Sequence, residues 1–180
     1  RLMDDLIEHT VASGTVDTVL NLAAGLDARP YRLKLSRTLQ WIEVDLPDVI
    51  AHKRSILGRE QPVCALESIA LDLADAPARR ALFARVGAGG RRVLVVSEGL
   101  LIYLAPEDVA ALADDLHAAP GMVAWLFDLG SPALLKFMER GWGKKLTEGG
   151  TPFRFGPAEG TGFFEPHGFL WQGAHLFANH

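Results

Sequence analysis

Residues 19–32 read Val-Leu-Asn-Leu-Ala-Ala-Gly-Leu-Asp-Ala-Arg-Pro-Tyr-Arg, an apolar run that breaks into a turn of small residues. Continuous Val and Leu indicate a parallel strand buried on both faces, and small residues let the backbone approach a ligand closely. A second apolar segment ends on Asp45, where a carboxylate can accept hydrogen bonds from ribose hydroxyls. This arrangement is typical of a nucleotide-binding crevice, although the glycine pattern alone is a weak signal.

The rest of the chain alternates between strand and helix patterns. Strands are expected at about 17–22, 41–45, 63–71, 92–99 and 122–128, and helices at about 2–13, 47–57, 76–86 and 106–118, with a further helix that starts at Pro30. Such alternation predicts an α/β fold with a Rossmann-like, doubly wound, mostly parallel sheet and helices on both faces. We expect one domain over residues 1–180, with ligands bound beyond the carboxyl ends of the strands.

Composition excludes several classes of protein. The 18 Lys and Arg and 22 Asp and Glu are interspersed, and the formal charge of -4 argues against nucleic acid binding. No apolar stretch approaches the roughly eighteen residues of a membrane helix, and no signal peptide is visible, so we expect a cytoplasmic protein. The single Cys64 is expected to be a buried thiol, and the histidines show no metal spacing, so no metal site is expected.

Small or acidic residues follow four of the predicted strands. They are the segment 23–27, Asp45, Asp72 and Glu98. Because the carboxyl ends of parallel strands meet at one edge of a sheet, we expect these residues to converge on a single crevice. One acid at such a position is as easily a helix cap or a solvated side chain, but four together favour a binding site.

The charges expected at this edge favour one class of cofactor. A sulfonium cofactor carries a positive centre, an ammonium and a carboxylate, which match acids, an arginine and backbone donors. A dinucleotide pyrophosphate needs backbone donors at a helix start without nearby carboxylates, and here Asp27 and Pro30 occupy that position. A methyl donor is therefore favoured. An NAD(P)-dependent oxidoreductase and a non-catalytic nucleotide-binding module remain the alternatives.

Three motifs occur in order along the chain: 21–33 (NLAAGLDARPYRL), 43–47 (EVDLP) and 97–104 (SEGLLIYL). They resemble the leucine carboxyl methyltransferase-like group of class I S-adenosylmethionine-dependent methyltransferases, which includes bacterial O-methyltransferases linked to polyketide metabolism. Residues 1–5 and 163–168 are similar to the family as well. The resemblance implies an enzyme that uses S-adenosyl-L-methionine to methylate a carboxyl or hydroxyl oxygen of a small molecule or protein.

The resemblance also implies a role for residues at the methionine end of the cofactor. Ala23 and Gly25 would line it with backbone groups, Arg1 would pair with its carboxylate, and Glu98 would face its amino group. The family usually has Gly at position 23. We expect Ala23 to adopt a right-handed or β backbone, so that the turn is kept.

At the other end of the cofactor, the resemblance implies that Asp45 holds the ribose and that Asp72, with the backbone of Leu73, lies at the adenine. The family has further carboxyl-terminal strands and an amino-terminal lid, and we expect both to be missing from this sequence. The methyl acceptor and the oligomeric state cannot be read from the sequence.

Methyl transfer needs alignment more than acid–base chemistry. A carboxylate acceptor is already ionised at neutral pH, with a reference pKa of about 4, whereas a phenol near 10 needs a base. His167 is the best candidate base, and the Tyr103 hydroxyl is placed to reach the substrate side. Ordinary loop polarity for His167 and a core position for Tyr103 are the competing interpretations.

Residues 141–168 are rich in Gly, Pro and Phe and lack periodicity, which is compatible with a lid or substrate loop or with a plain connection. Aromatic residues concentrate in the last third of the chain and either line an apolar substrate cavity or pack in the core. They are Trp125, Trp142, Trp171, Phe153, Phe155, Phe163, Phe164 and Phe169.

Overall fold

The computed structural model describes residues 1–137 and 152–170. Within them, one parallel sheet is formed in the order β3-β2-β1-β4-β5. Its strands are β1 (Thr18–Leu22), β2 (Gln40–Asp45), β3 (Ala65–Ala70), β4 (Val93–Ser97) and β5 (Met122–Phe127). The predicted α/β fold with a parallel, Rossmann-like sheet is confirmed. Because β2 and β4 lie on opposite sides of β1, the crevice between β1 and β4 is the expected ligand position.

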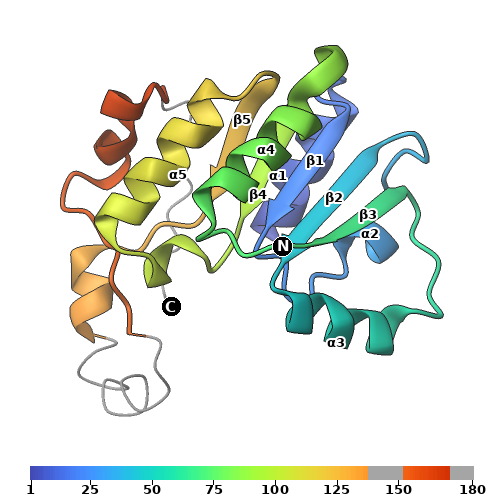
Figure 1. The fold of residues 1–180 in the computed structure, drawn as a ribbon, viewed down its shortest axis with the longest axis horizontal. Coiled ribbons are helices and arrows are strands. Elements are labelled where there is room, and N and C mark those ends of the chain that lie inside the picture. Colours follow the sequence, from blue (N-terminus) through green and yellow to red (C-terminus); the bar gives the residue numbers. More distant parts are fainter. Residues whose placement is uncertain (138–151, 171–180) are drawn as a thin grey trace.

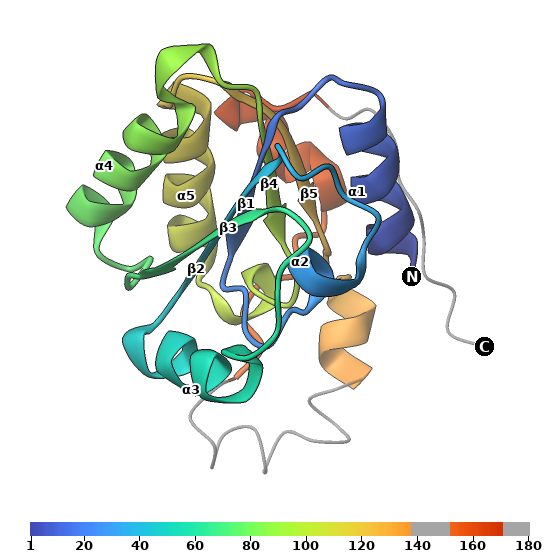
Figure 2. The same ribbon diagram turned by 90° about the vertical axis from the view of Figure 1, so that its right-hand side faces the viewer.

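Helices lie on both faces of the sheet. Helices α4 (Ala76–Gly87) and α5 (Pro106–Ala118) cover one face, and α1 (Leu2–Ala12) covers the other (Figures 1 and 2). The shorter elements are α2 (Arg29–Arg32), α3 (Pro47–Leu57) and the 3₁₀ turns η1 (Ala88–Gly90), η2 (Leu101–Tyr103) and η3 (Gly160–His167). The connections that follow β2 and β4 bring α3 and η2 to the carboxyl edge of the sheet.

Two hydrophobic clusters, one on each face, hold these layers together. Alternate residues of β1 contribute to each: Leu20 and Leu22 pack with α4 and α5, while Val19 packs with α1. All of β1 and β4 is buried, which explains why both strands read as continuous apolar runs. The sheet therefore holds the loops at its carboxyl edge on a rigid base.

The segment 141–168, for which no periodic structure was predicted, contains a helical turn in its described part. Residues 160–167 form η3, which packs beside α5, and Phe155 and Phe164 are buried in the cluster under α5. Trp125, Phe163 and Phe169 pack against the same cluster. For these five aromatic residues the core interpretation is correct. Trp142, Trp171 and the first part of the proposed lid, residues 141–151, lie outside the described residues.

Two further features bear on the predictions made from composition. Cys64 is buried, and burial raises the pKa of its thiol to about 11, so it is a neutral core residue. Among residues 1–137 and 152–170, no helix is both long and apolar enough to span a bilayer.

One face of the sheet carries a polar row near the carboxyl ends, where Asn21, Glu43 and Ser68 are register partners. Glu43 is almost completely buried, and its carboxylate accepts hydrogen bonds from the Ser68 hydroxyl at 2.7 Å and from the equally buried Lys53 ammonium at 2.5 Å. Lys53 belongs to α3, so this pair fixes α3 against β2 directly after Asp45.

Lys53→Met should lower the free energy of unfolding by about 3–5 kcal/mol, because it leaves the Glu43 carboxylate buried without a counter-charge. Urea denaturation measures the loss. The matched control is Arg85→Met, which breaks the exposed pair between Arg85 and Glu67 and should cost no more than about 1 kcal/mol. Equal losses for the two variants would contradict the role of the buried pair.

Candidate functional site

A cavity of about 290 Å³ opens at the carboxyl edge of the sheet. Residues that follow β1, β2 and β3 form one side, and η2 with the first half of α5 forms the other. Its lining consists of Ala23, Asp45, Leu46, Leu71, Asp72, Leu73, Ala74, Arg79, Leu100, Leu104, Asp108 and Leu112. The prediction that strand-end residues converge is therefore confirmed for Ala23, Asp45 and Asp72, which line one cavity.

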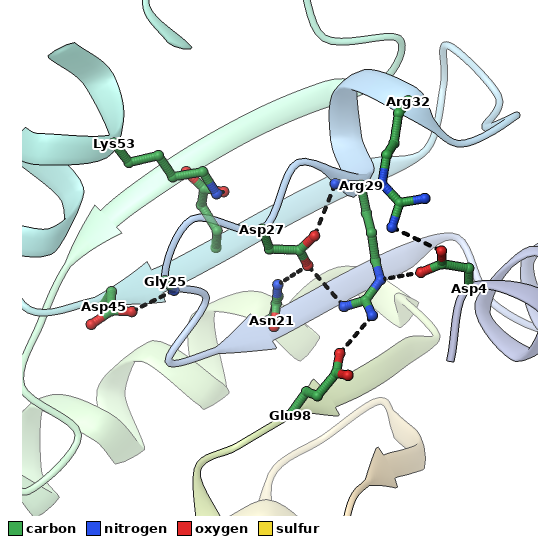
Figure 3. Close-up of polar contacts among 10 residues, drawn as sticks. Asp4, Asn21, Gly25, Asp27, Arg29, Arg32, Asp45, Lys53 and Glu98 are labelled. Atoms are coloured by element: carbon green, nitrogen blue, oxygen red, sulfur yellow. Dashed lines mark hydrogen bonds and ion pairs between the residues drawn. The ribbon is translucent and has the colours of Figure 1, made fainter. Parts of the chain in front are cut away.

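Asp45 joins the end of β2 to the loop after β1. Its Oδ2 accepts a hydrogen bond from the backbone N–H of Gly25 at 2.7 Å (Figure 3). Its Oδ1 accepts one from the N–H of Leu46 at 2.7 Å. Each carboxylate oxygen can accept a second hydrogen bond, so Asp45 keeps acceptor capacity for a ligand in the cavity. The same contact explains how the glycine turn keeps its position relative to β2.

The backbone of Ala23 differs from the sequence prediction. Its φ is +52°, in the left-handed region, and it is the one non-glycine residue of the described chain with positive φ. The expected right-handed or β conformation is wrong: Ala23 adopts a left-handed backbone in the turn after β1, and the next residue, Ala24, donates its N–H to the carbonyl of Val44 at 3.1 Å. Alanine tolerates this conformation at a cost of roughly 1–2 kcal/mol.

The Arg29 guanidinium joins three carboxylates that come from distant parts of the sequence. Its Nε lies 2.6 Å from Asp4 of α1, its Nη1 3.1 Å from Asp27 in the glycine loop, and its Nη2 2.5 Å from Glu98 after β4 (Figure 3). Asn21 of β1 donates a further hydrogen bond to Asp27 at 2.8 Å. We call Arg29 with these three acids the Arg29 cluster.

Most of the Arg29 cluster is withdrawn from water: the Arg29 side chain is 9% exposed, Asp4 14% and Asp27 12%. Burial lowers the pKa of Arg29, but the hydrogen bonds to Asp4 and Glu98 outweigh it and raise that pKa, so the guanidinium stays charged. Burial raises the pKa of Asp4, but hydrogen bonds from Arg29 and Arg32 reverse this and hold it below its ordinary value. Arg32 is itself exposed, so the buried part of the cluster has an excess of negative charge.

Three other residues predicted to bind the cofactor, Asp72, Glu98 and Arg1, differ in their contacts and exposure. Asp72 accepts a hydrogen bond from the N–H of Ala74 at 2.9 Å, which folds the 71–75 turn at the cavity wall. Glu98 is 48% exposed and uses one oxygen, Oε2, in the Arg29 cluster. Arg1 is exposed at the start of α1, three residues before Asp4.

The two predicted catalytic residues, Tyr103 and His167, lie on different elements. Tyr103 lies on η2 directly before the cavity residue Leu104, is half-exposed, and packs against Phe153 with ring centroids 5.4 Å apart. His167 lies on η3, with its Nδ1 2.7 Å from the carboxylate of Asp114 on α5. Neither side chain is among the residues that line the cavity: Tyr103 adjoins the lining residue Leu104, whereas His167 contacts α5.

Sequence reasoning missed the residues that hold the site together. Asp4 and Arg29 stand inside quoted motifs, but nothing in their spacing indicates that they pair. Arg79 donates to the carbonyl of Leu73 at 2.7 Å and to Asp115 at 2.9 Å, although an arginine near the start of a helix usually indicates an exposed face. These pairings depend on how distant elements pack, so no pattern in the sequence indicates them.

Comparison with known proteins agrees with this geometry. Residues 1–117 match the leucine carboxyl methyltransferase family. A Streptomyces coelicolor protein named as a candidate S-adenosyl-L-methionine-dependent methyltransferase is 39% identical over 118 residues, which cover 62% of this chain and 39% of that protein. The chain thus spans about two fifths of the length of this relative.

Solved structures share the fold. A DUF574 family protein from Streptomyces avermitilis has a TM-score of 0.70 at 16% identity, covering 90% of this chain and 65% of that one. Magnesium protoporphyrin IX methyltransferase from Synechocystis, solved with bound SAH, has a TM-score of 0.56 at 16% identity, covering 92% of this chain and 71% of that one.

Ala23→Gly should raise the free energy of unfolding by about 0.5–1 kcal/mol. Relief of the left-handed strain exceeds the extra flexibility that glycine gives the unfolded chain. Thermal denaturation measures the change. Ala24→Gly is the control, since buried Ala24 lacks the positive φ and its replacement should destabilise the protein. Destabilisation by both substitutions would contradict the strain at position 23.

The stability contributed by Asp4 should depend on pH. Because its pKa is lowered by folding, this contribution is fully present above the ordinary pKa of about 3.9 and is lost as pH falls through the folded value. The difference in free energy of unfolding between the wild type and Asp4→Asn should therefore shrink between about pH 5 and pH 2. Urea titrations at a series of pH values test this, and a difference that is constant with pH would contradict it.

Proposed function

The chain belongs to the leucine carboxyl methyltransferase family, and on that premise we propose that it binds S-adenosyl-L-methionine in the cavity at the carboxyl edge. It then transfers the methyl group to a carboxyl or hydroxyl oxygen of its acceptor. The observation that carries this proposal is the meeting of the β1 loop, Asp45 and Asp72 on one cavity. The names of the relatives support the same cofactor.

The residues present fit an adenosyl sulfonium compound. Asp45 has acceptor capacity for the two ribose hydroxyls, and the 71–74 segment supplies a carboxylate and backbone groups suited to the edge of an adenine ring. The Ala23 to Gly25 turn lies beside the Arg29 cluster, whose acidic excess suits an ammonium and a positive sulfur. Glu98 is the acid of that cluster with the most exposed side chain, so we assign it to the amino group. Arg1, exposed at the start of α1, is assigned to the carboxylate.

When bound, the cofactor supplies an activated methyl carbon. The task of this chain is then to fix that carbon and to exclude water. Six leucines line the cavity and give it a largely apolar wall: Leu46, Leu71, Leu73, Leu100, Leu104 and Leu112. Asp45, itself fixed by the backbone N–H of Gly25, would hold the ligand in one orientation, which is the main requirement of an in-line displacement.

The described cavity lining favours an acceptor that is already ionised. Its titratable side chains are Asp45, Asp72, Asp108 and Arg79, with no His, Lys or Cys among the described lining residues. A carboxylate needs no deprotonation at neutral pH, unlike a phenol or alcohol. We therefore rank a carboxyl acceptor first. Tyr103, on η2 directly before the lining residue Leu104, is the side chain we assign to acceptor positioning.

Isothermal titration of the protein with S-adenosylhomocysteine, and with NADH as the comparison ligand, tests the cofactor. We expect binding of the former alone. Supply of labelled S-adenosylmethionine with a panel of carboxylic acids, phenols and alcohols then tests the acceptor, and we expect labelled methyl esters. Absence of adenosyl binding, or preferential binding of NADH, would refute the proposal.

Asp45→Ala should weaken S-adenosylhomocysteine binding by about 1–3 kcal/mol, because the ribose donors lose their acceptor and the Gly25 turn loses its anchor. Asp48→Ala is the matched control: Asp48 is an exposed acid three residues later, on the first turn of α3, and does not line the cavity. Titration calorimetry compares the two. An affinity unchanged by Asp45→Ala would remove this residue from the site.

A further inference from the structure

Arg79 is a buried cation at the cavity wall whose bonds connect two separate elements. It is 7% exposed, and it projects from the first turn of α4 into the lining of the cavity. Its Nη1 donates to the carbonyl of Leu73 at 2.7 Å, its Nε donates to Oδ2 of Asp115 at 2.9 Å, and its Nη2 also donates to Asp115. Asp115 belongs to α5, the helix that supplies the opposite wall.

The segment that Arg79 holds is the one that the proposed function places at the adenine. Leu71, Asp72, Leu73 and Ala74 line the cavity consecutively. The Asp72 carboxylate fixes this turn by accepting from Ala74, and Asp75 then caps α4 by accepting from Ala78 at 3.0 Å. The carbonyl of Leu73 lies between these two turns and is fixed by Arg79. The position of the Leu73 peptide therefore depends on the guanidinium.

Asp115, on the opposite wall, holds this guanidinium in place. Its side chain is 14% exposed, and its second cation, Arg80, lies 3.8 Å away and is itself 57% exposed. Planar, charge-assisted contacts of this kind define direction as well as distance. The pair thus ties the turn after β3 to α5, with the cavity residues Asp108 and Leu112 on the same helix. A buried ion pair therefore connects the two walls directly.

We propose that Arg79, held by Asp115, is a positioning residue that sets the shape of the adenine end of the cavity and thereby its selectivity for adenine over other purine bases. The inference rests on the proposed function for the identity of the ligand. Arg79 acts through the backbone of Leu73, so its effect concerns the base and not the amino-acid end of the ligand. Lysine cannot replace it, because one ammonium cannot reproduce the fork that bonds Leu73 and Asp115 together.

The test measures binding of three probes to the wild type, Arg79→Lys, Arg79→Met and Asp115→Asn. The probes are S-adenosylhomocysteine, 5′-methylthioadenosine, which lacks the amino-acid end, and S-inosylhomocysteine, which carries a 6-oxo group in place of the adenine amino group. Arg85→Met is the matched control, since Arg85 lies on the same helix in an exposed pair with Glu67. Thermal denaturation of each variant accompanies the titrations.

We expect Arg79→Met and Asp115→Asn to weaken both adenine-containing probes by about tenfold or more. The preference for S-adenosylhomocysteine over S-inosylhomocysteine should fall with them, while Arg85→Met leaves every affinity unchanged. Arg79→Lys should fold and still lose the preference for S-adenosylhomocysteine over S-inosylhomocysteine. This variant therefore tests the inference even if Arg79→Met does not fold.

Two results would overturn the inference. One is adenine affinity and selectivity in folded Arg79→Lys and Asp115→Asn equal to those of the wild type. The other is an equal loss for all three probes, which would reduce Arg79 to a stabilising residue. Failure of the wild type to bind any adenosyl probe would instead refute the proposed function itself.

Discussion

The buried guanidinium of Arg29 is the contact on which the carboxyl edge of the sheet depends. It draws together α1 through Asp4, the glycine loop through Asp27 and the segment after β4 through Glu98. Withdrawing charges from water costs several kcal/mol for each ion, so such a cluster persists only in the geometry that pairs them all. The position of each loop is consequently coupled to the others, and the crevice between β1 and β4 has one preferred shape.

Two further polar contacts extend this arrangement across the sheet. Asp45 holds the Gly25 backbone from β2, and Arg79 holds the Leu73 carbonyl from α4. Together with the Arg29 cluster they fix the loops that follow β1, β2, β3 and β4, each to a neighbouring element. The proposed methyl transfer would gain from such preorganisation, because little freedom remains to be lost when the ligand binds.

The sequence was sufficient for the parts of the structure that depend on local pattern. Continuous apolar runs predicted β1 and β4, and Pro47 with Gly58 bounded α3 at the residues where the structure has it. Strand-end residues predicted the cavity because topology alone brings them to one edge. The left-handed Ala23, the Arg29 and Arg79 pairings and the contact of His167 with Asp114 depend on where distant elements pack. The η3 turn was missed because Gly and Pro obscure helical periodicity.

A crystal structure of the protein with bound S-adenosylhomocysteine is the most direct test of the central claim that these loops form one preorganised adenosyl site. The ribose hydroxyls should bond to Asp45, the adenine should lie against the Leu73 backbone, and the amino group should approach Glu98, with the Arg29 cluster unchanged. A ligand bound elsewhere, or an Arg29 cluster that separates on binding, would contradict it.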